Sequence, residues 1–168
     1  PVFDTLVEWN SGDVDPRVAD LTGLERCTDL TELRLVRQNV SNISAVASLT
    51  NLQTLDFSFN SISDISPVAG LTNLTQLKLG GNDYSDATPV AGLASLEWLV
   101  LGLTNVTDIT PVLGLSALET LNLDFLTLPD VSLLSTMSSL VTLRLSDTNV
   151  SDIDTLSPLA GTGALTNL

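Results

Sequence analysis

The side chains in this chain that could do chemistry are mostly carboxylates, and many recur at a fixed spacing of 22 residues. Stacked carboxylates could bind calcium, which takes oxygen ligands. They could instead accept N–H bonds at the start of a helical turn, where the helix dipole favours negative charge. We favour capping, because one member is an asparagine, which caps turns as well as aspartate does. The series is Asp20, Asn42, Asp64, Asp86, Asp108, Asp130 and Asp152.

Other catalytic groups are scarce. The chain has no histidine and one cysteine, Cys27, so Ser–His and Cys–His pairs, histidine-ligated zinc and thiolate clusters are not available. Cys27 occupies a leucine column and is expected to be a small buried hydrophobe. Gly80-Gly81 is too short for a phosphate-binding loop. Paired carboxylates remain possible, but no pair stands out. We therefore predict no enzyme activity, no catalytic residues, no metal site and no cofactor.

Charge limits the partners. The 168 residues carry 20 acidic and 6 basic side chains, which gives a net charge of −14 and a pI near 4.1. Nucleic-acid binding relies on basic side chains that neutralise phosphates, so nucleic acid is not an expected partner. Anionic membrane surfaces are disfavoured for the same reason. No apolar run approaches the roughly 20 residues that span a bilayer, so we expect no membrane insertion.

The carboxylate spacing follows a repeat that covers most of the chain. LTNLQTLDFSFNSISDISPVAG at 49–70 and LTNLTQLKLGGNDYSDATPVAG at 71–92 share 12 of 22 positions. The spacing L-x-x-L-x-x-L-x-L-x-x-N is typical of a leucine-rich repeat. Leucines two apart point to one face of a short strand, so stacked coils predict a parallel sheet with one buried face. Strands are expected near 32–36, 54–58, 76–80, 98–102, 120–124 and 142–146.

The second half of each coil contains apolar residues three apart, as in a 3₁₀ turn. Only about 12 residues remain for this return, too few for a long α-helix. Pro67, Pro89 and Pro111 lie near the start of these turns, where a missing N–H costs little. The predicted fold class is therefore α/β: a leucine-rich repeat solenoid, or horseshoe, with a parallel sheet on the concave face and 3₁₀ turns on the convex face.

The ends depart from the period. VFDTLVEW near the start places Val2, Phe3, Leu6 and Val7 on one helical face, so residues 1–20 are interpreted as an N-terminal cap. Residues 21–168 form the repeat array, with about six coils of 22 residues. LTNL at 165–168 arrives six residues later than the period requires, so the last coil is irregular or truncated. Because LTNL begins a coil, we expect the protein to continue past Leu168.

Two coils in the middle of the array also deviate. Leu126 stands where an asparagine usually bonds backbone groups, so the fifth coil, 115–136, is expected to be locally irregular. In the third coil Tyr84 replaces a β-branched residue and Ala87 replaces an isoleucine. We expect the large and the small side chain to compensate in volume.

The outward positions of the expected sheet, equivalent to 54, 56, 58 and 59 in six coils, hold four of the six basic and four of the twenty acidic residues. This concave face is formally neutral and carries an apolar group around Trp98. Aromatic groups with basic neighbours are typical of protein-binding hot spots. The alternative is that Phe59, Leu103 and Phe125 fold back over the strand ends as packing. The candidate binding residues are Arg34, Phe59, Lys78, Trp98, Val100, Leu103, Asn122, Phe125 and Arg144.

LTNL, NSISDISPVAG and TNVTDITPV resemble the 22-residue repeats of bacterial internalins, and LTGLERCTDLTEL resembles the start of such an array. The resemblance covers roughly residues 20–168. It implies a surface-attached or secreted protein that binds other proteins through the concave sheet. Individual binding residues do not transfer, because the family varies those positions.

Two classes of function follow. The favoured one is a protein-binding module, here expected to be a monomer, in which the partner docks around Trp98 with Lys78 and Arg144 meeting acidic groups. The alternative is a structural spacer that holds another domain away from a surface. A cytosolic regulatory scaffold is a variant of the first, and the sequence does not separate an extracellular or cell-surface location from a cytoplasmic one.

Overall fold

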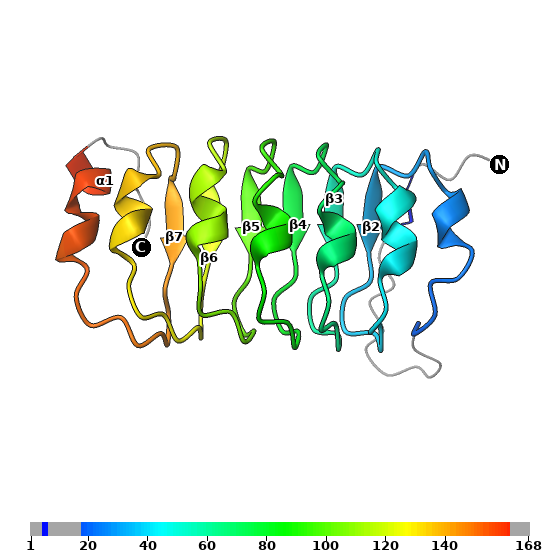
Figure 1. Ribbon diagram of the computed structural model, residues 1–168, viewed down its shortest axis with the longest axis horizontal. Coiled ribbons are helices and arrows are strands. Elements are labelled where there is room, and N and C mark those ends of the chain that lie inside the picture. Colours follow the sequence, from blue (N-terminus) through cyan, green and yellow to red (C-terminus); the bar gives the residue numbers. More distant parts are fainter. Residues whose placement is uncertain (1–4, 7–17, 162–168) are drawn as a thin grey trace.

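The computed structural model describes residues 5–6 and 18–161, with side chains described for 18–159. The strands stand side by side in one layer, and each coil returns through a second layer of short helices (Figure 1). Within the described residues the sheet is parallel and its strand order follows the chain from β1 to β7. The strands are β1 Thr5–Leu6, β2 Glu32–Arg34, β3 Thr54–Asp56, β4 Gln76–Lys78, β5 Trp98–Val100, β6 Thr120–Asn122 and β7 Thr142–Arg144.

The return of each coil is a 3₁₀ helix, as the spacing of three predicts, and neighbouring helices contact one another. Pro67, Pro89 and Pro111 occupy the first turns of η3, η4 and η5. The helices are η1 Leu24–Arg26, η2 Ser44–Ser48, η3 Ser66–Val68, η4 Thr88–Val90, η5 Thr110–Gly114, η6 Ser132–Thr136 and η7 Asp154–Leu156. The fold is therefore the predicted open solenoid with a parallel sheet and 3₁₀ turns.

The strands begin where expected but end two residues earlier. β3 is in register with β4, Leu55 opposite Leu77, and the other pairs from β2 to β7 keep the same 22-residue offset. Backbone bonds between coils nevertheless continue beyond the strand: Phe57 N donates to Lys78 O at 2.9 Å and Phe59 N to Gly80 O at 2.8 Å. Each coil is thus held by its neighbour up to the turn that follows the strand.

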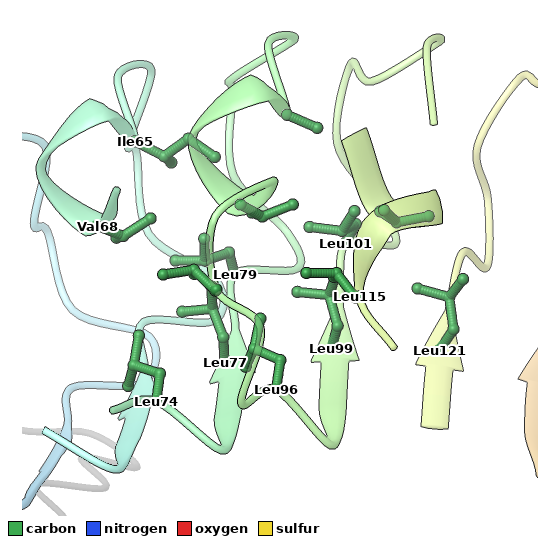
Figure 2. Close-up of a cluster of buried hydrophobic side chains, with 14 of the residues drawn as sticks. Ile65, Val68, Leu74, Leu77, Leu79, Leu96, Leu99, Leu101, Leu115 and Leu121 are labelled. Atoms are coloured by element: carbon green, nitrogen blue, oxygen red, sulfur yellow. The ribbon is translucent and has the colours of Figure 1, made fainter. Parts of the chain in front are cut away.

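The leucine columns form the core. Leu77, Leu99 and Leu121 are 0% exposed, as are Leu79 and Leu101 from the next column. Figure 2 shows these side chains in the space between the strands and the turns that carry Ile65 and Val68. The core therefore runs along the stack instead of filling a sphere.

The ends differ from the expectation in part. Thr5–Leu6 is a strand paired in parallel with β2, so the predicted helical face is wrong at Leu6. Edge pairing explains this, because an open first coil offers unpaired backbone groups. Val2, Phe3 and Val7 lie outside the described residues, and so does LTNL at 165–168. The boundary between cap and array stays a prediction.

At the other end η7 is followed directly by a short α-helix, α1 Ser157–Gly161, which contacts η6 and η7. Leu159 from this helix is 1% exposed and joins the core. The chain therefore departs from the repeat at α1, and the extent of the last coil stays a prediction. At the first coil, Cys27 is only half-buried and packs against the core as a free thiol.

An asparagine ladder joins the coils at the turn after the strand. Asn82 Oδ1 accepts from Ile62 N at 3.0 Å, and its Nδ2 donates to Phe57 O and Leu79 O, both at 2.9 Å. Asn82 itself is 4% exposed. One side chain therefore satisfies backbone groups of two neighbouring coils that would otherwise be buried without partners.

The fifth coil lacks this asparagine but keeps its strand and its turn. Leu126 is 1% exposed and packs in the core. The amide that an asparagine at this position would bond, Val106 N in the preceding coil, donates instead to Thr104 Oγ1 at 3.4 Å. The expected irregularity is thus confined to hydrogen bonding, because a threonine hydroxyl of the preceding coil supplies the acceptor.

The large and small residues of the third coil are both buried. Tyr84 is 1% and Ala87 2% exposed, as the expected volume compensation requires. Burial raises the pKa of the Tyr84 phenol far above its ordinary value, so the group is neutral.

The aspartate series caps the convex turns. Oδ1 of Asp108 accepts from Thr110 N at 2.9 Å, and Oδ1 of Asn42 accepts from Ser44 N at the same distance. Bonds from Thr110 lower the pKa of Asp108, although the charge of Asp86 opposes the shift. No three His, Cys, Asp or Glu side chains in the described part of the chain are placed to hold a metal ion. Asp20, Asp64, Asp86, Asp130 and Asp152 make the equivalent bond at 2.8 Å.

Replacing Leu99 by alanine should lower the free energy of unfolding by about 2–5 kcal/mol, because it leaves a cavity in the middle of the core. Leu133→Ala is the matched control, since Leu133 is 45% exposed on the convex side, and it should change stability by less than about 0.5 kcal/mol. Urea unfolding followed by circular dichroism measures both. Equal midpoints for the two variants would contradict the phase of the repeat.

Asp108→Ala should lower the melting temperature at pH 7, whereas Asp108→Asn keeps the Oδ1 acceptor and should melt close to wild type. The folded-state pKa of Asp108 is lowered, so its stabilisation is present above about pH 4 and is lost as pH falls through the folded value. Wild type should therefore lose stability towards acid more steeply than Asp108→Asn. Melting curves should not respond to calcium; a large rise that a chelator reverses would argue for a calcium ladder instead.

Candidate functional site

The concave face consists of two sets of residues in each coil. The first set is the outward strand positions equivalent to Thr54 and Asp56, and the second is the turn positions equivalent to Ser58 and Phe59. Trp98, the first residue of β5, is 41% exposed and in register with Gln76 and Thr120 on the adjacent strands. Its outward direction is as the strand register predicts. Val100, two residues on, points to the same face and is half-buried.

The turn position after each strand has a left-handed backbone. φ is +58° at Phe59, +60° at Leu103 and +64° at Phe125, with Gly81 at +71° in the same column. A left-handed conformation costs a residue with a Cβ roughly 1–2 kcal/mol, and glycine avoids this cost. Large side chains therefore occupy positions where glycine would suit the backbone better.

These turn side chains are also exposed to solvent: Phe59 is 44%, Leu103 46% and Phe125 50% exposed. The alternative that they fold back as packing therefore does not describe Leu103 and Phe125. Phe59 combines both roles, because a Cβ on Gly81 would lie 2.6 Å from its ring. The ring thus lies over Gly81 and still keeps almost half of its surface in water.

Together these residues form a band, here called the apolar band: Phe59, Trp98, Val100, Leu103 and Phe125. One part of the band follows β5 from Trp98 to Val100 and continues to Leu103 in the turn after the strand. The other part runs across the coils along equivalent turn positions, from Phe59 past Gly81 and Leu103 to Phe125. A Cβ on Gly80 would lie 3.1 Å from Val100 Cγ1, so the glycines of the third coil make room for the band.

The basic residues of the concave face all contact partners within the chain. Lys78 Nζ lies 4.5 Å from the centre of the Trp98 ring, and Arg37 Cζ lies 5.0 Å from the centre of the Phe59 ring. Such cation–π contacts contribute about 0.5–1 kcal/mol at exposed sites and restrict the rotamers of both aromatic residues. Arg34 Nε lies 2.5 Å from Glu32 Oε1 on its own strand.

A polar network lies on the concave face of the fifth and sixth coils. Asp124, only 7% exposed, accepts from Arg144 Nε at 2.9 Å, from Ser146 N at 2.7 Å and from Asn122 Nδ2 at 2.9 Å. Burial alone would raise the pKa of Asp124, but these bonds outweigh it and the pKa is lowered. Asp124 therefore stays charged and fixes both Arg144 and Asn122.

Sequence reasoning missed Asp124 and Gly102 as members of this site. A Cβ at Gly102 would lie 2.7 Å from Asn122 Oδ1, so glycine is needed for the Asn122 side chain to lie across the fourth coil. The only sequence signal is the column itself, which places Gly80, Gly102 and Asp124 at equivalent positions. Which neighbour a side chain bonds cannot be deduced from that column.

Leu103→Gly should leave the free energy of unfolding within about 1 kcal/mol of wild type. Relief of the left-handed backbone offsets the extra freedom that glycine gains in the unfolded chain, about 0.4–1 kcal/mol. Leu101→Ala is the contrasting variant two residues earlier: Leu101 is 0% exposed, and its loss should cost about 2–5 kcal/mol. Chemical denaturation measures both. A loss of more than 2 kcal/mol in Leu103→Gly would mean that Leu103 is part of the core.

Comparison with known proteins supports the same fold. The family model for leucine-rich repeats (2 copies) matches residues 50–91. No curated protein sequence matches this chain. A structure of internalin F from Listeria monocytogenes is 26% identical with a TM-score of 0.64, covering 91% of this chain and 57% of that one. The chain thus spans little more than half of that internalin.

Two further structures are similar. Internalin C2 from Listeria monocytogenes is 27% identical with a TM-score of 0.64, covering 85% of this chain and 73% of that one. A leucine-rich repeat protein of Leptospira interrogans is 20% identical with a TM-score of 0.75, covering 86% of this chain and 38% of its own. The 22-residue coils, the parallel sheet with its 3₁₀ turns and these similarities lead to one identification: the chain is a leucine-rich repeat protein that resembles the internalins.

Proposed function

We propose that this chain is a protein-binding module whose partner docks on the concave face over the apolar band. The observation that carries the proposal is that the large side chains of the apolar band cost conformational and solvation free energy. Phe59, Leu103 and Phe125 combine a left-handed backbone with about half of their surface in water. Neither feature stabilises the fold, so a function other than folding explains the large side chains best.

The band also has the composition and rigidity of a binding hot spot. Trp98 is the central anchor, because tryptophan is enriched among residues that dominate binding energy. Lys78 restricts the Trp98 ring, and Gly81 and Arg37 restrict Phe59. Side chains that are ordered before binding lose less entropy when a partner arrives. Val100, Leu103 and Phe125 supply further apolar area, and Arg34, Asn122 and Arg144 supply polar contacts beside it.

A binding role suits the chain better than catalysis, because the concave face presents apolar and internally paired groups. Within the described residues no helix is long and apolar enough to cross a membrane. The likeness to internalins supports a bacterial surface or secreted location. We further propose that the chain acts as a monomer. Cell fractionation and light scattering test these two points.

The experiment that tests the proposal is selection from a random 12-residue peptide library displayed on phage, with the immobilised protein as bait. Binders should be recovered that bind wild type and lose binding to the double variant Trp98→Ala, Lys78→Glu. This variant removes the anchor and its cation–π partner, and the melting temperature should fall by no more than about 4 °C, because the contact contributes only about 0.5–1 kcal/mol and neither residue lies in the core. Leu133→Ala, on the convex side, is the control and should bind as wild type does.

Selection that yields no binder dependent on Trp98, or binders that the double variant retains, would contradict the proposal. The spacer interpretation would then be the better one. If the double variant melts much earlier than wild type, its loss of binding could reflect unfolding. Leu103→Gly then serves as the second test, because it removes another band residue without a core contact and should also lose binding.

A further inference from the structure

The charge distribution around the concave face indicates the chemistry of the partner. We infer that the band receives a polypeptide segment of net positive charge that carries a large apolar side chain. This inference rests on the proposed function, because it specifies what docks on the same surface.

The concave face itself offers little positive charge to an acidic partner. It holds four of the six basic residues, but they are balanced by Glu32, Asp56, Asp124 and Asp147. Arg34 and Arg144 are ion-paired within the chain, and Lys78 lies on the ring of Trp98. At Arg34 and Arg144 an acidic segment would have to compete with carboxylates that are already in place, and Lys78 is held on the Trp98 ring.

The Arg144 pair shows this competition most clearly. Asp124 is held by three donors and is almost fully buried, whereas the Arg144 side chain is 58% exposed. A second carboxylate approaching Arg144 would also approach the charge of Asp124. Like charges at such distances oppose binding.

The N-terminal ends of β5 and β6, where Trp98 lies, are acidic. Glu97 precedes Trp98, and Glu119 occupies the same position in the next coil, where its amide donates to Glu97 O at 2.9 Å. Both residues are exposed, and neither belongs to an ion pair found among the described residues. The turn at the opposite end of the strands adds the exposed Asp83. A cation of the partner that approaches these strand ends would therefore meet two carboxylates without displacing any group, whereas Lys78 would repel a cation placed on the Trp98 ring itself.

The long-range electrostatic field of the whole chain is also negative. Because the concave face is formally neutral, the remainder of the chain carries the whole net charge of −14. Electrostatic steering of this kind raises the association rate of oppositely charged partners and repels acidic ones. Apolar contact at the band and opposite charge around it together select a basic, apolar segment.

The test uses the peptides selected against the wild-type protein. Trp98-dependent binders should be enriched in Lys and Arg beside an aromatic or large aliphatic residue, and their affinity should fall as salt rises from 50 to 500 mM. The double variant Glu97→Gln, Glu119→Gln should weaken the affinity of a selected peptide about three- to tenfold. The matched control is Asp86→Asn, Asp108→Asn, which removes the same charge from the convex turns and should change affinity less than twofold. Isothermal titration with the synthetic peptide measures both.

The outcomes separate the two proposals. Trp98-dependent binders that are neutral or acidic, or equal effects of the two double variants, would overturn the basic partner and leave the binding module standing. The absence of any Trp98-dependent binder would overturn the binding module, and the inference with it. Melting curves of both double variants at pH 7 show whether a loss of affinity reflects unfolding.

Discussion

The backbone bonds between neighbouring coils fix the position of every other group in this protein. Each strand from β2 to β7 contributes only three residues to the sheet, too few to be stable alone, and the bonds continue from Phe57 N and Phe59 N into the next coil. The leucines that point inward are buried only because the coil on each side covers them. Order in one coil therefore depends on its neighbours, as in other repeat proteins.

This dependence explains why some departures from the repeat are tolerated. Leu126 removes an asparagine from the ladder, yet the backbone amide of Val106, which that asparagine would bond, finds the hydroxyl of Thr104 in its own coil. A second acceptor thus lies within reach, so the loss of one side chain changes the bonding and not the path of the chain. Tyr84 and Ala87 adjust volume within one coil in a similar way.

The same stacking also creates the candidate binding surface. Because all coils turn at the same point, a left-handed position recurs in every coil and its side chains align across the sheet. The chain fills this column with Phe59, Leu103 and Phe125 and leaves Gly81 free for the Phe59 ring. The surface that results is apolar and neutral on a protein whose remaining surface is strongly acidic. This contrast gives both the place and the chemistry of the proposed partner.

Periodicity determined most of the fold from the sequence alone. The leucine columns, the 3₁₀ turns, the first residue of each strand from β2 to β7 and the aspartate caps all follow from residue types at a spacing of 22, since local geometry repeats when sequence repeats. The outward direction of Trp98 follows from the alternation of a strand. The short strand at Thr5–Leu6 did not follow, because the residues around it match no repeat and pairing with β2 decides its conformation.

Only the tertiary structure decided how the outward residues interact. The contacts of Lys78 with Trp98, of Arg37 with Phe59 and of Arg144 with Asp124 join residues 20 or 22 positions apart on different coils. A repeat pattern aligns such residues but does not say which rotamers meet, because several side chains of one column compete for the same space. Burial of Asp124 and exposure of Leu103 depend on that competition, which is settled by the stacked neighbours and not by any single coil.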